Sequence, residues 1–297
     1  MKFGTYPFNH ENLSLREKLD SIKRVGFDFV ALSYEELEEG AAYCRKIGLP
    51  IENVHLNARR SSLLWVEDAR GDEIVDRYCE QIEKSAALGI QVGIAHVTYG
   101  SELPPPNPAG LRRFERMVAC AERCGFTLCL ENTRASDHLD YAMKRLQSPN
   151  VRYCYDSGHD IGMATGTEFF GTYLKNYGDR LGALHIHDSI PGFDLHVAPF
   201  DGAIDWLKIA AELAQTAYGR EKLCLEPGGR ICAKKEGKTA AELSATYAAM
   251  AIAEDKSLVR FYDGCYTVYE QLDFEQILRR YYDGLVRIAE MIEHEKA

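Results

Sequence analysis

Histidines and carboxylates follow short apolar runs at six places in the chain, where strands would end. They are His55, His96, Glu131, Asp156 with His159, His185 with His187 and Asp188, and Glu226. Side chains of these kinds bind divalent metal ions and transfer protons. Several carboxylates gathered at one place repel one another and resist burial unless a cation lies among them. If the six runs end at a common place, the sequence predicts a metal site there.

The elements that must position these side chains are repeated units of a strand and a helix. Runs rich in β-branched and aromatic residues alternate with segments of helical periodicity. We expect strands at 2–8, 27–33, 51–58, 91–99, 127–133, 151–158, 182–188 and 222–229. We expect helices at 12–26, 36–48, 72–89, 108–125, 138–147, 168–178, 204–219 and 274–296. Because the strands are continuous apolar runs, they should be parallel and covered on both faces.

Local signals mark the ends of several helices. Ser14 precedes Glu17 by three residues, which predicts a capping box at the start of the first helix. Five helices stop at a glycine shortly before the next strand, as a left-handed helix cap requires. These glycines are Gly26, Gly48, Gly89, Gly125 and Gly219.

Eight such units in 297 residues predict a (β/α)₈ TIM barrel that forms a single domain over 1–297. A barrel of this kind takes roughly 250 residues, which leaves about forty over. We assign the surplus to an insertion at about 230–272, between strand eight and the last helix, with a helical stretch near 240–253. A doubly wound open sheet is the alternative, but the first strand is not followed by a glycine-rich phosphate loop.

Composition restricts the partners and the compartment. Apolar residues make up 46% of the chain, and the formal net charge is −10 with no run of Lys or Arg longer than two. A nucleic-acid partner is therefore disfavoured. No signal peptide or membrane-spanning segment is evident, so we expect a cytoplasmic protein that does not bind a membrane. The nine cysteines should be reduced thiols, and a zinc site at Cys120 and Cys124 is the weaker alternative.

Five motifs give the chain a family resemblance. They are "CLENT", "DSGH", "LHIHD", "GAIDW" and "CLEPG", in this order along the chain. With them the chain resembles the xylose isomerase-like TIM barrels, specifically the sugar phosphate isomerase/epimerase superfamily, over about residues 1 to 230 and the last helix. That superfamily includes ketose 3-epimerases, hydroxypyruvate isomerase, inosose isomerases and dehydratases and, more distantly, endonuclease IV.

The resemblance implies a single divalent metal ion, and the implied ligands are Glu131, Asp156, His185 and Glu226. Oxygen-rich ligation with one imidazole suits Mn²⁺, Mg²⁺ or Co²⁺, and Zn²⁺ also accepts this set. His185 and His187 lie on the same side of a strand, so both can face the barrel interior. The family's ligand stands three residues before the acidic residue, which selects His185. His187 then either supports the site or contacts the substrate.

The same resemblance implies which residues contact the substrate. His159 would bind it, with His55 and His96 lining the mouth of the barrel. Arg134 and Arg230 follow the two glutamates closely and would bind a phosphate or carboxylate of the substrate. Plain surface charge is the alternative for both arginines.

The implied activity is that of a divalent-metal-dependent isomerase or epimerase of a sugar, a sugar phosphate or a keto-polyol. Such an enzyme removes a proton from the carbon next to a carbonyl, and a metal ion lowers the barrier to the enediolate. Glu131 and Glu226 would act as base and acid on opposite faces of the substrate. A dehydratase acting on an inosose would begin with the same step and is the alternative.

Two further readings of the chain lead elsewhere. Asp194 and His196 have the Asp-x-His spacing of the three-metal cluster in endonuclease IV, which would suit a phosphodiesterase. One-metal members have a similar segment, and with the acidic composition we interpret it as a loop that orders the site. A barrel that only binds a sugar or serves assembly is a third hypothesis. The aromatic run at 260–270 should form a contact in a homo-oligomer, with a lid or local packing as alternatives.

Overall fold

Strands and helices alternate along the chain and fall into two units. The computed structural model describes residues 1–8, 13–100, 103–133, 136–162, 172–189, 194–228, 232–234, 266–268 and 273–296. The first unit, called the terminal unit, is built from Met1–Asp28, Asp156–Gly178 and His185–Ala297. The second, called the central unit, is built from Phe29–Tyr155 and Asp179–Leu184.

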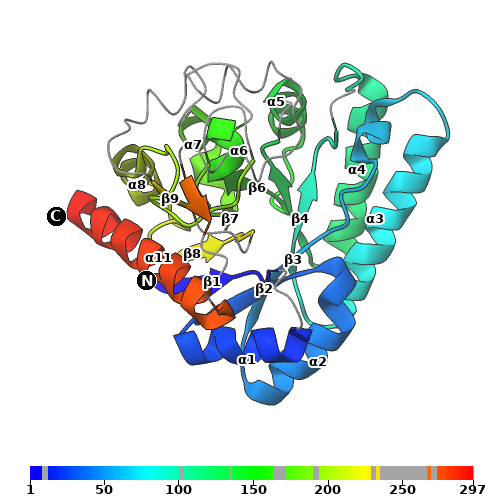
Figure 1. The fold of residues 1–297 in the computed structure, drawn as a ribbon. Helices are drawn as coiled ribbons and strands as arrows, with labels where there is room; N and C mark the ends of the chain where they lie inside the picture. Colours follow the sequence, from blue (N-terminus) through cyan, green and yellow to red (C-terminus); the bar gives the residue numbers. More distant parts are fainter. Residues whose placement is uncertain are drawn as a thin grey trace. The chain divides into compact units, whose positions relative to one another are not determined.

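The central unit contains a parallel sheet covered by helices. Its strands are β2 (Phe29–Ser33), β3 (Ile51–His55), β4 (Val92–His96), β5 (Thr127–Glu131), β6 (Val151–Asp156) and β7 (Leu181–His185), and they lie side by side in chain order. Its helices are α2 (Leu37–Ile47), α3 (Arg70–Ala87), α4 (Pro108–Arg123) and α5 (Ser136–Arg145), with 3₁₀ turns η1 (Tyr34–Glu36) and η2 (Ser61–Trp65). Helices α3 and α4 pack side by side (Figure 1). Ile94, Cys129, Cys154 and Ala183 form a buried cluster on the strands.

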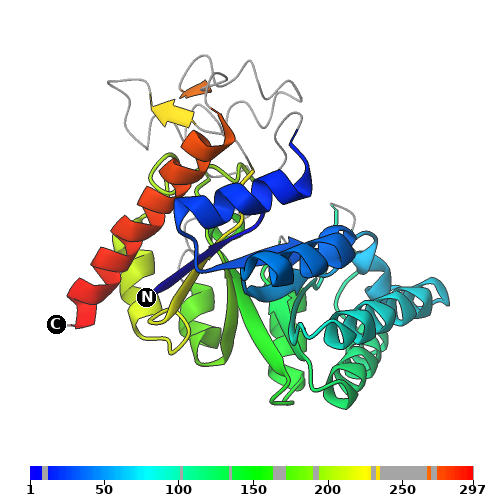
Figure 2. The same cartoon turned by 90° about the horizontal axis from the view of Figure 1, so that it is seen from below.

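The terminal unit pairs the first strand with the eighth. Strands β1 (Lys2–Thr5) and β8 (Lys222–Leu225) are parallel neighbours. Its helices are α1 (Leu15–Val25), α6 (Ser157–Gly162), α7 (Thr172–Tyr177), α8 (Trp206–Ala214) and α11 (Phe274–Lys296). The long helix α11 packs against α1 and α8 (Figure 2). The last residues of β6 and β7, Asp156 and His185, belong to this unit.

The predicted strands are all present, but most end earlier than expected. Ser157 and Gly158 were expected in a strand and instead begin helix α6. Asp156 explains the change, because its Oδ1 accepts a hydrogen bond of 2.6 Å from the backbone N–H of His159. That contact is typical of an aspartate that caps the start of a helix. The side chain that ends the strand therefore also begins the helix.

The helix-end predictions are confirmed in most cases. Ser14 and Glu17 form the expected capping box. Gly26, Gly48, Gly89 and Gly125 have left-handed backbones, as expected. The prediction for Gly219 is wrong, because helix α8 already ends at Ala214. A turn follows in which Thr216 Oγ1 donates to Leu213 O and accepts from the Gly219 N–H, so no left-handed glycine is needed.

Two short strands are the described part of the expected insertion. Strands β9 (Cys232–Lys234) and β10 (Tyr266–Val268) pair in antiparallel fashion. The helical stretch expected near 240–253 lies outside the described residues, as does most of the aromatic run at 260–270. The single domain over 1–297 and the oligomer contact stay predictions.

The cysteines behave as the sequence predicts. Seven of them are described as free thiols. Burial raises the pKa of the Cys120 thiol, which lies 3.7 Å from the carbonyl oxygen of Cys79. Within the described residues, the side-chain groups that can hold a metal ion include no cysteine. The described helices include none that is both long enough and apolar enough to cross a membrane.

A buried arginine fixes the loop that follows β3. Arg113 of α4 is 6% exposed. Its guanidinium donates to the carbonyl oxygens of Leu64 at 3.0 Å, Asp68 at 2.5 Å and Val66, and its Nε lies 3.3 Å from Asp72 Oδ1. Since buried carbonyl oxygens need donors, one side chain from α4 binds the backbone of this loop at several carbonyl oxygens.

We expect Arg113→Leu to lower the free energy of unfolding by about 3 kcal/mol or more, because the buried carbonyl oxygen of Leu64 loses its donor and those of Val66 and Asp68 each lose one. Arg116→Leu is the matched control. Arg116 lies on the same helix and also contacts Asp72, at 2.7 Å, but its side chain is 50% exposed. The control should cost less than about 1 kcal/mol. Denaturant unfolding of both variants tests this, and equal losses would contradict the assignment.

Candidate metal centre

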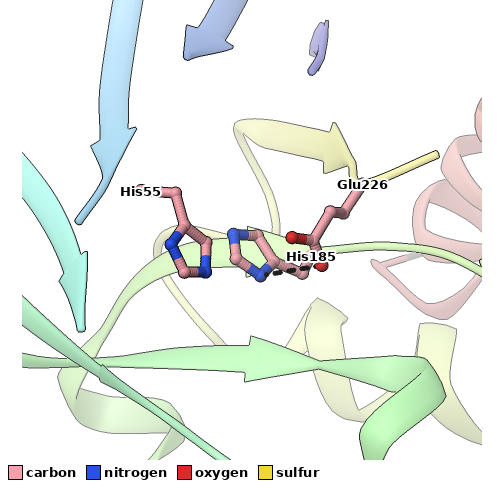
Figure 3. A group of neighbouring side chains, drawn as sticks. All are labelled: His55, His185 and Glu226. Carbon is pink, nitrogen blue, oxygen red and sulfur yellow. Dashed lines mark ion pairs between the residues drawn. The ribbon is translucent and has the colours of Figure 1, made fainter. Parts of the chain in front are cut away.

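The terminal unit brings together three of the predicted metal ligands. Asp156 ends β6, His185 ends β7, and Glu226 follows β8 directly. His185 Nδ1 lies 3.3 Å from Glu226 Oε2, the ion pair drawn in Figure 3, and 3.7 Å from Asp156 Oδ2. Ligand atoms around one divalent ion lie about 3.0–3.6 Å apart, given ligand distances of about 2.0–2.2 Å. The three side chains therefore fit a shared cation.

The other nitrogen of His185 is held by a residue that the sequence analysis missed. Tyr6 OH lies 3.2 Å from His185 Nε2, and the two rings meet edge to face with centroids 5.3 Å apart. This contact leaves Nδ1 as the nitrogen that faces the carboxylates. Tyrosines are common in buried segments, so nothing in the sequence around Tyr6 indicated this contact with His185.

Asp156 stays ionised in this arrangement. The side chain has no exposed surface. Burial alone would raise the pKa of Asp156, but electrostatic attraction from the imidazoles of His159 and His187 and hydrogen bonds from His185 and His187 hold that pKa well below its usual range. The carboxylate is therefore in the form that binds a cation.

A second group in the terminal unit is formed by His159, Asp194 and His196. Asp194 Oδ2 lies 3.4 Å from His159 Nε2, and Asp194 Oδ1 lies 3.0 Å from His196 Nε2. This group can also hold a metal ion. Burial lowers the pKa of His196, but Asp194 and Glu226 outweigh it and raise that pKa to about 9. The sequence analysis interpreted the segment with Asp194 and His196 as a loop that orders the site. This loop also supplies side chains that contact His159.

The backbone of His196 is strained and firmly held. Its φ of 49° is left-handed, which is uncommon for a residue with a side chain. Its carbonyl oxygen accepts hydrogen bonds from Gly228 N at 2.9 Å and from Tyr281 OH at 2.6 Å. Its Nδ1 lies 2.9 Å from the carbonyl oxygen of Glu226. Strain of this kind persists where surrounding contacts over-determine the conformation, and it often occurs at functional sites.

Asp188 holds the loop that carries Asp194 and His196. Its carboxylate accepts hydrogen bonds from Ser189 N at 2.8 Å, Phe200 N at 2.9 Å, Ile204 N at 3.1 Å and Trp206 Nε1 at 2.8 Å. Burial raises the pKa of Asp188 to about 6, although these N–H groups favour the ionised form. The acidic residue of "LHIHD" is therefore joined to the "GAIDW" motif by direct hydrogen bonds.

The central unit gathers a third group at the ends of neighbouring strands. His55, His96 and Glu131 are the last residues of β3, β4 and β5, and His96 and Glu131 are partners in the sheet register. Glu131 Oε2 lies 3.0 Å from His96 Nε2 and 3.4 Å from His55 Nε2, and the two histidine nitrogens are 3.1 Å apart. These separations also fit a metal ion. Glu131 is fully buried, and the two histidine side chains are about one-sixth exposed.

Most of the predicted site residues thus have, within their own unit, neighbours whose side chains can bind a metal ion. The set of four predicted ligands takes Glu131 from the central unit and the other three from the terminal unit, so its convergence stays a prediction. His187, predicted to support the site or to contact the substrate, has no exposed surface. Arg134 and Arg230 lie outside the described residues.

Comparison with known proteins identifies the family. The sequence model of the xylose isomerase-like TIM barrel matches residues 19–249. The chain belongs to this family. The predicted (β/α)₈ barrel fold is therefore confirmed. Among curated proteins, the uncharacterized protein y4fM of Sinorhizobium fredii (strain NBRC 101917 / NGR234) is 43% identical over 247 residues, covering 69% of this chain and 78% of the relative.

Several solved structures share the fold at low sequence identity. L-Ribulose 3-epimerase has a TM-score of 0.69 and 16% identity, covering 100% of this chain and 97% of the other. The IOLI protein, solved with a bound zinc atom, has a TM-score of 0.68 and 18% identity, covering 98% of both chains. D-Psicose 3-epimerase from Clostridium cellulolyticum H10, solved with D-tagatose, has a TM-score of 0.66 and 16% identity, covering 98% and 99%.

We expect Asp188→Asn to loosen the loop between β7 and α8. An amide replaces one acceptor oxygen by a donor, so two buried N–H groups lose their partner, at a cost of about 2 kcal/mol or more. Hydrogen exchange at Phe200 and Ile204 should become faster, and the free energy of unfolding should fall.

Asp205→Asn is the control for this prediction. Asp205 is the exposed residue that caps α8, and asparagine caps helices equally well. Exchange at Phe200 and Ile204 should not change in that variant. Unchanged exchange in Asp188→Asn as well would show that Asp188 does not hold the loop.

Proposed function

We propose that the protein is a divalent-metal-dependent isomerase or epimerase of a sugar or keto-polyol, with or without a phosphate group. The observation that carries this proposal is the buried group of Asp156, His185 and Glu226, whose facing atoms are spaced as ligands of one ion are. Family membership and the epimerases among the proteins of the same fold support it. A dehydratase acting on an inosose is the alternative on the same residues.

Glu131 is proposed as the fourth ligand. In a TIM barrel the carboxyl ends of all strands open at the same mouth, and Glu131 ends the strand before the one that carries Asp156. Three carboxylates and one imidazole suit Mn²⁺, Mg²⁺ or Co²⁺, and the zinc atom in the IOLI protein supports Zn²⁺ as a further choice.

The proposed chemistry is transfer of a proton at the carbon next to a carbonyl group. A bound divalent ion would supply positive charge that stabilises the anion formed when that proton leaves. Glu131 and Glu226 are the proposed base and acid: one removes the proton, and the other returns a proton to the opposite face. The Glu226 side chain is 21% exposed, so a substrate can reach it.

Other predicted residues are proposed as substrate contacts. His55 and His96 each keep about one-sixth of the side chain exposed, which leaves an edge for hydrogen bonds with hydroxyl groups. His159 is 7% exposed and is proposed to bind the substrate from the start of α6. Arg134 and Arg230 are proposed to bind a phosphate or carboxylate where the substrate carries one.

We expect Glu226→Gln to lower proton exchange by about 100-fold or more, because an amide cannot accept and return the proton. The assay follows solvent deuterium into ketoses and inososes incubated with the protein and Mn²⁺. Glu221→Gln is the control: Glu221 is exposed and directly precedes β8, and the variant should exchange at the wild-type rate. Equal rates in both variants would remove Glu226 from the mechanism.

The proposed function also predicts what happens when the metal ion is removed. Exhaustive treatment with EDTA should abolish deuterium exchange, and Mn²⁺ or Co²⁺ should restore it, since the anion is then stabilised by the ion again. The folded state of the metal-free protein is checked by circular dichroism. Full exchange after complete chelation would contradict metal dependence.

A phosphodiesterase with several metal ions is the second candidate. Two observations favour it, namely the groups His55, His96 and Glu131 and His159, Asp194 and His196, each of which can hold an ion of its own. The net charge of −10 opposes it, because a duplex requires a basic surface. Elemental analysis separates the two functions: one ion per chain supports the isomerase, whereas three ions with cleavage of an abasic duplex would support the phosphodiesterase.

A further inference from the structure

His187 is a fully buried histidine beside a proposed metal ligand. It lies two residues after His185 and has no exposed surface. Its Nε2 lies 3.0 Å from Asp156 Oδ1 and 3.2 Å from Asp156 Oδ2. A ring with no exposed surface is poorly suited to contact a substrate, so its role must be exerted through Asp156.

The contacts of the ring determine where its proton lies. Nδ1 faces the carbonyl oxygen of Asp188 at a long distance of 3.4 Å. A carboxylate only accepts hydrogen bonds, and bonds to a charged acceptor are stronger than bonds to a neutral one. The proton of a neutral His187 therefore belongs on Nε2, which donates to Asp156.

This bond leaves the two oxygens of Asp156 with different tasks. His187 Nε2 contacts both oxygens, at 3.0 Å from Oδ1 and with its hydrogen bond to Oδ2 at 3.2 Å, whereas the backbone N–H of His159 donates to Oδ1 alone, at 2.6 Å. Oδ2 is the oxygen on the side of His185 Nδ1, 3.7 Å away. A donor at each oxygen, His159 N–H at Oδ1 and His187 Nε2–H at Oδ2, fixes the plane of the carboxylate with Oδ2 on the side of the His185 ligand.

The ring of His187 is closely packed by two neighbours. A Cβ atom at Gly158 would lie 1.8 Å from His187 Cε1, so only glycine fits there. His196 stacks in parallel on one face of the ring, with ring centroids 3.9 Å apart and planes 11° apart. Ser157 Oγ donates to the carbonyl oxygen of His187 at 2.7 Å and accepts from its N–H at 3.0 Å. The Ser157 bonds hold the backbone of His187, and tilting the imidazole away from Asp156 would disturb its packing against Gly158 and His196.

We propose that His187 is a positioning residue, whose Nε2–H donor orients Asp156 for the divalent ion. The inference rests on the proposed function for the presence of that ion. The sequence left two roles open for His187, and the inference selects support of the metal site over contact with the substrate. It also gives the glycine of "DSGH" a purpose, since the close approach of the ring requires it.

The test compares two amides at this position. In His187→Gln the amide nitrogen reaches the place of Nε2, whereas in His187→Asn it reaches only the place of Nδ1. Metal-free protein is titrated with Mn²⁺, and the free ion is followed by electron paramagnetic resonance. We expect His187→Asn to bind Mn²⁺ about 10- to 100-fold more weakly than wild type, the usual effect of losing a hydrogen bond to a ligand. His187→Gln should bind within about threefold of wild type, since its donor is retained.

His138→Asn is the matched control. His138 is also a buried histidine, 5% exposed, and its Nε2 lies 2.6 Å from the carbonyl oxygen of Pro104 in the central unit. This variant loses a buried hydrogen bond without touching a proposed ligand. Its Mn²⁺ affinity should equal that of wild type, even where its thermal stability is lower.

The outcomes are distinguishable. Wild-type protein that binds no Mn²⁺ or other divalent ion overturns the proposed function and this inference with it. Wild-type binding together with equal affinities for the Asn and Gln variants overturns the inference alone. Nitrogen-15 spectra of the histidines in metal-loaded wild type need no variant to fold: an Nε2–H tautomer for His187 supports the inference, and an Nδ1–H tautomer overturns it.

Discussion

The buried charge of Asp156 is the constraint on which the terminal unit's site depends. A carboxylate without exposed surface is costly unless donors or cations surround it. Here a backbone N–H from α6 donates to Oδ1, the imidazole of His187 contacts both oxygens, and His185 lies beside Oδ2. These contacts keep the group ionised while excluding water. They therefore produce a strong anionic ligand at the point where β6 ends.

The surrounding elements are shaped by the need to hold this charge in place. Helix α6 begins directly after the strand because Asp156 caps it. Gly158 provides room for the His187 ring, and Gly202 likewise provides room for Asp188, whose Oδ1 would lie 2.1 Å from a Cβ atom at that position. Asp188 in turn accepts hydrogen bonds from Ser189 N and Trp206 Nε1. His196, which lies between these two residues in the chain, stacks on the ring of His187. The backbone turns around the site and the positions of its side chains thus depend on the same hydrogen bonds.

Sequence reasoning predicted the repeating strands and the polar residues that end them, because continuous apolar runs followed by His, Asp or Glu leave a clear pattern. It did not predict features that depend on contacts distant in sequence. Tyr6 meets His185 across 179 positions, and nothing near Tyr6 marks that contact. The start of α6 was missed because Asp156 both ends the strand and caps the helix, and the sequence analysis considered only its place at the end of the strand. Gly219 was misjudged because Thr216 closes the turn with its side chain, which periodicity does not record.

The central proposal is that Glu131 joins Asp156, His185 and Glu226 around one divalent ion. The most direct measurement is an anomalous-difference map from crystals soaked in Mn²⁺, recorded on both sides of the manganese absorption edge. The account predicts a peak about 2.0–2.4 Å from Asp156 Oδ2, His185 Nδ1 and an oxygen of each glutamate. A map without a peak among these atoms, or with Glu131 turned away from it, would contradict the account.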